Sequence, residues 1–188
     1  MIIDDLYIVN YCHRNCVPLR NIMRLPKAEA FALAREMAEQ NKETTAFYRF
    51  ADFENYYPRR LQTDALLYDR FTQLGGKPVE KHPLSFVLQG SDYLDGWFDR
   101  GIVTKVPLSR IPSGCVSFTY GDSMAALERQ HEFTMLTKDM LLQAIADYEG
   151  TVEAYLADAV QRHQYHYMEV QIWDDACLKD CAETTVRD

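Results

Sequence analysis

Strict alternation near the end of the chain is the sequence feature that most constrains its fold. In YHYMEVQIW (165–173), Met168, Val170 and Ile172 fall on one side of an extended chain together with His166. The other side carries Tyr165, Tyr167, Glu169, Gln171 and Trp173. A period of two residues predicts a β-strand whose apolar side faces a core. The opposite side combines aromatic rings with a carboxylate and an amide, which makes it the first candidate binding surface.

The rest of the chain mixes helix and strand signals without the regular alternation of a doubly wound sheet. Aromatic and β-branched runs predict strands at 5–12, 82–89, 102–108 and 115–120. Helical spacing of apolar residues predicts helices at 26–41, 59–76, 91–101, 121–130, 138–148 and 152–163. We therefore predict an α+β fold: a mostly antiparallel sheet of about five strands with helices packed against it.

Residues typical of helix caps and turns predict where several of these elements begin and end. Pro26 suits the first turn of a helix, and Gly75 is a stop signal. Ser91, Thr137 and Thr151 are plausible N-caps. The stretch at 44–60 is interpreted as irregular or part-extended, and the strands at 102–108 and 115–120 as a central hairpin-like unit joined by the turn-forming IPSG.

Composition bounds the class of protein. The 188 residues are 47% hydrophobic and 26% charged, which is ordinary for a globular chain, and we predict a single domain over residues 1–188. No apolar run approaches the ~18 residues of a membrane-spanning helix, and the acidic start is unlike a signal peptide. The five cysteines are an odd number, which argues against a secreted disulfide framework. A cytoplasmic location is expected, and the compact chain is typical of a bacterial protein.

The negative charge is unevenly distributed along the chain. The net charge is −8, and residues 121–188 alone carry five basic and fourteen acidic side chains. Such a field repels phosphates, so we expect no nucleic-acid partner, and the absence of a long apolar run predicts no membrane partner. The expected partner is a small molecule or another protein.

The polar side of the terminal strand has two interpretations. It can pack beneath the preceding helices, in which case Glu169 needs a partner such as an arginine from 49–60. Alternatively it lines a cleft, where Tyr165, Tyr167 and Trp173 stack a flat ligand while Glu169 and Gln171 bind its hydroxyls or amides.

CVSFTYGDS (115–123) is the second candidate site. Ser117 and Thr119 share one face of the predicted strand, which leads into Gly121 and a helix start. The free N–H groups of a helix start favour an anion, and glycine permits close approach of a ligand. A simple capped turn, with Asp122 or Ser123 as the cap, is the alternative.

The order of these pieces is similar to that in ADP-ribosyltransferases. That family combines a His or Arg on an early strand, a Ser/Thr strand and a late strand bearing Glu. The counterparts are His82 in HPLSF, Ser117 and Thr119 in VSFT, and Glu169 in MEVQ. The similarity implies that Glu169 stabilises an oxocarbenium-like ribose and that the rings stack nicotinamide. The residue that usually precedes the glutamate is not matched, because Gln171 follows Glu169 instead.

Cysteine spacing raises the question of a metal. Cys12 and Cys16 are four residues apart, as are Cys177 and Cys181. Two such pairs can form a Cys₄ zinc site, but zinc knuckles more often use a two-residue gap. We predict free thiols, no metal and no cofactor, and we keep a zinc-stabilised structural protein as an alternative.

Arg59 and Arg60 follow two tyrosines in FENYYPRR (53–60). They can clamp a carboxylate or phosphate through bidentate hydrogen bonds, or anchor this segment to the acidic last third of the chain. Both interpretations place one of them near Glu169.

The sequence therefore favours a small ligand- or partner-binding protein without an evident catalytic motif, since nucleotide-loop and hydrolase signatures are absent. The first alternative is a nucleotide- or NAD-using transferase with Glu169 as its key carboxylate.

Overall fold

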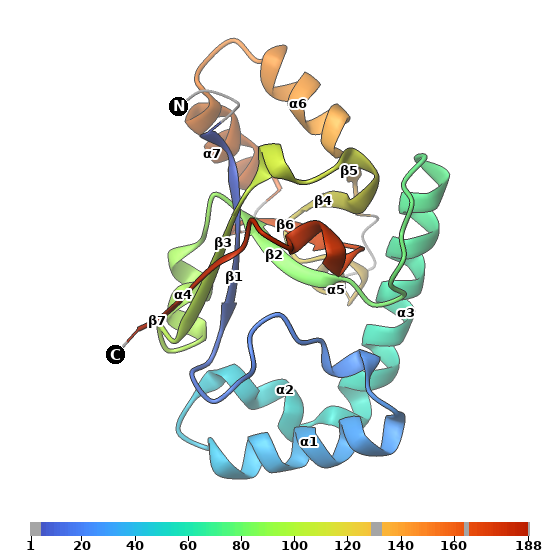
Figure 1. The fold of residues 1–188 in the computed structure, drawn as a ribbon, viewed down its shortest axis with the longest axis vertical. Helices are drawn as coiled ribbons and strands as arrows, with labels where there is room; N and C mark the ends of the chain where they lie inside the picture. Colours follow the sequence, from blue (N-terminus) through green and yellow to red (C-terminus); the bar gives the residue numbers. More distant parts are fainter. Residues whose placement is uncertain (1–4, 129–132, 164–165, 188) are drawn as a thin grey trace.

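A computed structural model of the chain describes residues 5–128, 133–163 and 166–187 (Figure 1). One sheet with the strand order β5-β4-β6-β2-β1-β3-β7 forms its centre, and neighbouring strands run antiparallel. The strands are β1 (Tyr7–Cys12), β2 (Leu84–Leu88), β3 (Ile102–Pro107), β4 (Val116–Tyr120), β5 (Met135–Thr137), β6 (Met168–Ile172) and β7 (Glu183–Val186). The α+β prediction is confirmed. The sheet has seven strands instead of about five, because the short edge strands β5 and β7 carry little sequence signal.

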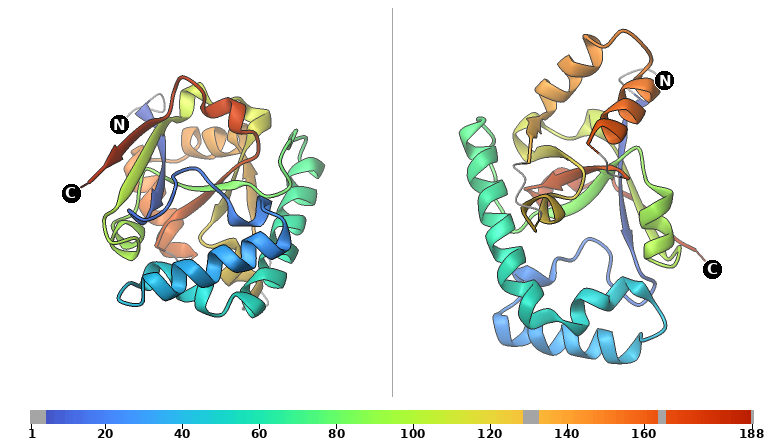
Figure 2. Two further views of the ribbon diagram at one scale, coloured as in Figure 1. Left: turned by 60° about the horizontal axis from the view of Figure 1, so that its bottom comes forward. Right: turned by 180° about the vertical axis from the view of Figure 1, so that it is seen from behind.

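The helices gather at the two ends and along one side of the sheet. They are α1 (Lys27–Gln40), α2 (Tyr48–Ala51), α3 (Phe53–Gln73), α4 (Asp92–Trp97), α5 (Ser123–Glu128), α6 (Lys138–Ala146) and α7 (Val152–Arg162). Helices α1 and α2 lie at one end, α6 and α7 lie at the other, and α3 runs alongside the sheet (Figures 1 and 2). No helix in the described ranges has both the length and the apolar character needed to cross a membrane.

The predicted helix boundaries rest on side-chain caps that the structure contains. Ser91, Thr137 and Thr151 each accept a hydrogen bond from a backbone N–H in the first turn of the helix that follows, at 3.4, 3.2 and 3.2 Å. Gly75 follows α3 with a φ of 88°, a left-handed conformation that glycine adopts without strain. These caps fix where α4, α6 and α7 begin and where α3 ends.

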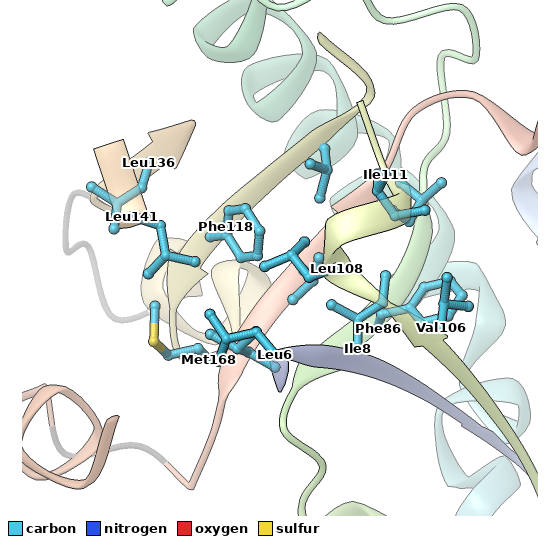
Figure 3. Packing of buried hydrophobic residues seen from close by; sticks show 14 of the residues in the cluster. Leu6, Ile8, Phe86, Val106, Leu108, Ile111, Phe118, Leu136, Leu141 and Met168 are labelled. Atoms are coloured by element: carbon cyan, nitrogen blue, oxygen red, sulfur yellow. The ribbon is translucent and has the colours of Figure 1, made fainter. Parts of the chain in front are cut away.

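The main core lies on the face of the sheet that carries the apolar side of β6. Met168, Val170 and Ile172 pack there with Phe118 and with residues of α6 and α7 such as Leu141 (Figure 3). The alternation that predicted β6 therefore assigns its apolar face correctly.

The expected hairpin between 102–108 and 115–120 is wrong. Strand β3 pairs with β1 and β7, whereas β4 pairs with β5 and β6, so three strands separate them. The connection makes two 3₁₀ turns, Leu108–Arg110 and Ser113–Cys115, instead of one tight turn. Leu108 and Ile111 are buried in the core, and this burial draws the connection across the sheet.

The irregular stretch expected at 44–60 is largely helical. It contains a 3₁₀ turn (Thr45–Phe47), α2 and the first two turns of α3, with Pro58 inside the helix. Phe53 anchors this segment, because it is buried in a second hydrophobic cluster with Ala30 and Ala34 of α1. Tertiary packing of the aromatic residues thus overrides the helix-breaking signal of proline.

Candidate functional site

A run of polar side chains crosses the face of the sheet opposite the main core. The register pairs Thr119 with Glu169 and Ser117 with Gln171 on adjacent strands β4 and β6. All four side chains are buried. Polar groups buried at this density require partners, and the partners define the candidate site.

Glu169 is the central carboxylate, with 6% of its surface exposed. Its Oε2 accepts hydrogen bonds from the backbone N–H of Ser123 at 2.9 Å and from Oγ1 of Thr119 at 3.3 Å. Burial and the negative charge of Asp122 raise the pKa of Glu169, while the charge of Arg60 and the Ser123 N–H oppose this rise.

A buried ion pair from α3 supplies the positive charge. Nη2 of Arg60 lies 2.7 Å from Oδ1 of Asp64, one helical turn later, and Nδ1 of His82 lies 2.7 Å from Oδ2 of the same carboxylate. Burial lowers the pKa of Arg60, but the charges of Asp64 and Glu169, among others, raise it above its ordinary value. Arg60 is therefore a fixed cation beside Glu169. Arg59 lies on the exposed side of α3, where its Nε donates to the carbonyl of Asn55 at 3.1 Å.

His82 does not lie on a strand. It comes two residues before β2, and its ring reaches the site through Asp64. Three of the four residues compared with ADP-ribosyltransferases are thus tied to one cluster, which we call the polar cluster: Arg60, Asp64, His82, Thr119, Asp122, Ser123 and Glu169.

Ser117, Gln171 and Trp173 form a buried network that is joined to the polar cluster, since Nε2 of Gln171 donates to Oγ1 of Thr119 at 3.1 Å. Ser117 donates to Oε1 of Gln171 at 2.7 Å and accepts from Nε1 of Trp173 at 2.8 Å. The ring of Trp173 stacks on Phe71 of α3 with centroids 5.8 Å apart. All three side chains are buried instead of facing solvent, and Trp173 packs against Leu67 and Phe71 of α3.

The solvent side of the polar cluster is formed by Asp122, Arg49 and Tyr167. Asp122 caps α5 through the Ala125 N–H at 2.9 Å, accepts from the hydroxyl of Tyr167 at 3.3 Å, and lies 3.7 Å from Nη2 of Arg49. The side chains of Arg49 and Asp122 are 36% and 24% exposed. Arg49 was not among the predicted site residues, because the segment around it gave no clear helix signal.

A row of exposed and half-buried rings continues outward from Arg49 and Tyr167. We call Tyr48, Trp97, Tyr93 and His166 the aromatic row, since consecutive ring centroids are 5.4, 6.0 and 4.5 Å apart. Tyr48 accepts a hydrogen bond from Nε of Arg49 at 3.1 Å, and His166 directly precedes Tyr167. Three segments distant in sequence thus place aromatic surface beside the solvent side of the polar cluster. The predicted site residue Tyr165 lies outside the described residues.

A separate groove of about 440 Å³ lies farther along the same face of the sheet, over β1 and β3. Tyr7, Tyr11, Lys105 and Arg187 line it, together with the Gln89–Gly90–Ser91–Asp92 segment. Nζ of Lys105 lies 3.5 Å from the centre of the Tyr7 ring, and Arg187 pairs with Asp95 at 2.7 Å. The groove therefore offers rings and cations within a size typical of small-ligand sites, about 300–1,000 Å³.

The structure groups the cysteines differently from the spacing of the sequence. Cys177 lies beside Cys115, which directly precedes β4, and both lie near Asp174. Burial and the neighbouring Cys115 thiol raise the pKa of Cys177 to about 12. Burial and the neighbouring Cys16 raise the pKa of Cys12 to about 11.

Comparisons of the chain with protein families, curated proteins and solved structures give no match.

Proposed function

We propose that the chain is a nucleotide- or NAD-using transferase in which Glu169 is the key carboxylate. The observation that carries the proposal is the burial of Glu169 where the negative charge of Asp122 and the positive charge of Arg60 both act on its carboxylate. Titratable groups whose pKa values are shifted by burial and by specific neighbours concentrate at functional sites.

Burying the charged side chains of the polar cluster costs folding free energy, because they lose their hydration. Arg60, Asp64 and Glu169 are all buried, and buried charges rarely stabilise a fold more than apolar residues of the same volume would. Apolar packing is possible on the same face of the sheet, because Trp173, Phe71 and Leu67 form a hydrophobic cluster there. An ionisable side chain at this buried position therefore supports a role in chemistry.

The aromatic row and Arg49 support a nucleotide as the substrate class. Exposed rings stack on flat heterocycles, and a guanidinium pairs with phosphate oxygens. Arg49 holds Asp122 only at 3.7 Å, so a phosphate can replace that carboxylate as its partner. The ribose of such a ligand would then lie toward Glu169.

In this position the side chains have distinct roles. The ionised carboxylate of Glu169 stabilises positive charge that develops on the ribose as its bond to the leaving base breaks. Arg60 favours the ionised form of Glu169, and Thr119 together with the Ser123 N–H fixes its orientation. Asp64 and His82 act as positioning residues, since they hold Arg60 in place.

The test measures the release of nicotinamide from NAD⁺ and the thermal shift of the protein with NAD⁺ and with ATP. Glu169→Gln should lower the release rate by roughly 10²-fold or more while the NAD⁺-induced shift persists. Arg49→Met should mainly raise KM, because it removes a phosphate contact.

Glu43→Gln is the matched control, because Glu43 lies exposed in the turn after α1 and should leave both readings unchanged. The proposal fails if wild-type protein neither releases nicotinamide nor is stabilised by either nucleotide. It also fails if Glu169→Gln retains the full release rate.

The groove over β1 and β3 favours a second candidate function, a small-molecule binding protein. Its tyrosines and cations suit a flat anionic ligand. Lys105→Met distinguishes the two candidates. It should abolish a ligand-induced thermal shift if the groove is the main site, and leave it intact if the ligand lies at Arg49.

A further inference from the structure

We propose that Cys115, Asp174 and Cys177, with Cys181 as the fourth ligand, bind a zinc ion that joins the start of β4 to the end of β6. The site is distinct from the proposed transferase site and does not depend on it. It also differs from a Cys₄ site built from the two CxxxC pairs, because Cys115 and Asp174 take the places of Cys12 and Cys16.

The antiparallel pairing of β4 and β6 explains why these residues meet. Val116 faces Ile172 in the register, so Cys115 and Asp174 lie just beyond the same end of the strand pair. A hydrogen bond of 2.9 Å from the Trp173 N–H to the Cys115 carbonyl ties the two segments together. Their relative placement is thus set by the sheet itself.

A short 3₁₀ turn, Asp175–Leu178, brings the second thiol back toward the first. The Cys177 N–H donates to the Asp174 carbonyl at 3.1 Å, and Oδ1 of Asp174 accepts from the Ala176 N–H at 2.9 Å. The other carboxylate oxygen of Asp174 takes no part in that cap. Among the described residues, the ligand atoms of Cys115, Asp174 and Cys177 lie within 4.8 Å of one another.

These distances are close to those of a tetrahedral metal site. Zn–S bonds of about 2.3 Å place two thiolates roughly 3.8 Å apart around one ion, so a contraction of about 1 Å or less suffices. Thiolate sulfur with one carboxylate oxygen is a ligand set that suits zinc, whereas magnesium and calcium prefer oxygen alone.

Cys181, three residues beyond that turn, is the thiol that we propose as the fourth ligand. Its Sγ donates to the Cys177 carbonyl at 3.3 Å, which places this thiol beside the backbone of the second cysteine ligand. All four side chains are partly accessible, which leaves a path for the ion to enter.

The experiment uses the full chain, stripped of metal under reducing conditions, and titrates it with Zn²⁺ and separately with Co²⁺. We expect one equivalent of zinc and, with Co²⁺, the thiolate charge-transfer absorption of a tetrahedral site. Cys115→Ser and Cys177→Ser should each abolish this absorption, whereas Cys12→Ser, the matched control, should retain it.

Asp174→Asn provides a second measurement that does not risk the fold, since it preserves the shape of the side chain. It should weaken zinc binding at least tenfold and change the Co²⁺ spectrum. The proposal is overturned if wild-type protein takes up no stoichiometric zinc. It is equally overturned if Cys12→Ser removes the binding, because the ion would then lie at the other cysteine pair.

Discussion

At the scale of single residues, Glu169 combines deep burial with hydrogen bonds from Thr119 and from the Ser123 N–H. An arginine partner was expected, but Arg60 forms its ion pair with Asp64 and acts on Glu169 through its charge. The isosteric change Glu169→Gln retains an oxygen that can accept from Thr119 and from the Ser123 N–H. We therefore expect this variant to melt at the same temperature as wild type or higher at pH 8.

The sign of the pH dependence follows from the raised pKa of Glu169. The folded protein holds the proton more tightly than the unfolded chain, so stability falls as pH rises from the ordinary carboxyl pKa of 4.5 through the raised value. Glu169→Gln lacks this fall, and its advantage over wild type should grow between pH 4 and pH 8. Melting curves across that range measure the difference. A variant that loses stability relative to wild type toward high pH would show that Glu169 is instead favoured as an anion.

At the scale of elements, β4 is a largely buried strand, with four of its five residues buried. Phe118 is fully buried in the main core, where it faces Val170 on β6 and Leu136 on β5 (Figure 3). Phe118→Ala should lower the free energy of unfolding by ~3–5 kcal/mol, because it removes the ring and leaves a cavity. Urea denaturation measures the loss. Val79→Ala, at a position 66% exposed, is the control and should change stability by at most about 0.5 kcal/mol.

The strands and capped helices are the elements that local sequence predicts best. Alternation around Val170 and the caps at Ser91, Thr137 and Thr151 are local signals, and the structure contains each of them. Residues 53–60 were not predicted as helix, because Pro58 is a helix-breaking signal. The contacts that stabilise this helix are made by Phe53 with α1, which is distant in sequence.

The candidate site was predicted only in part, for the same reason. Glu169 and Thr119 could each be placed on a strand by pattern, but the pairing of the two strands could not. Arg49 and Asp64 join the site through packing between segments that no local signal connects. Cys115 meets Cys177 only because β4 and β6 are neighbours, and the expected hairpin with β3 concealed that neighbourhood.

At the scale of the whole molecule, the sheet is assembled from pairings between distant parts of the sequence. Strand β6 lies between β2 and β4, and β1 lies between β2 and β3. Domains rich in such non-local pairings fold in milliseconds to seconds, whereas helical bundles fold in microseconds to milliseconds. We expect stopped-flow refolding of this chain in the slower range. Refolding within microseconds would show that the helices, and not the sheet pairings, limit the rate.

The position of β6 has a consequence for synthesis on the ribosome. Strand β2 leaves the exit tunnel well before its neighbour β6 exists, since about 80 residues separate Leu88 from Ile172. At about 5–20 residues per second, the free edge of β2 remains unpaired for roughly 4–16 s before β6 has been synthesised. During that interval the nascent chain presents unpaired backbone that other chains can join. Chaperone dependence and aggregation of this protein should therefore be decided during translation, before strand β6 is made.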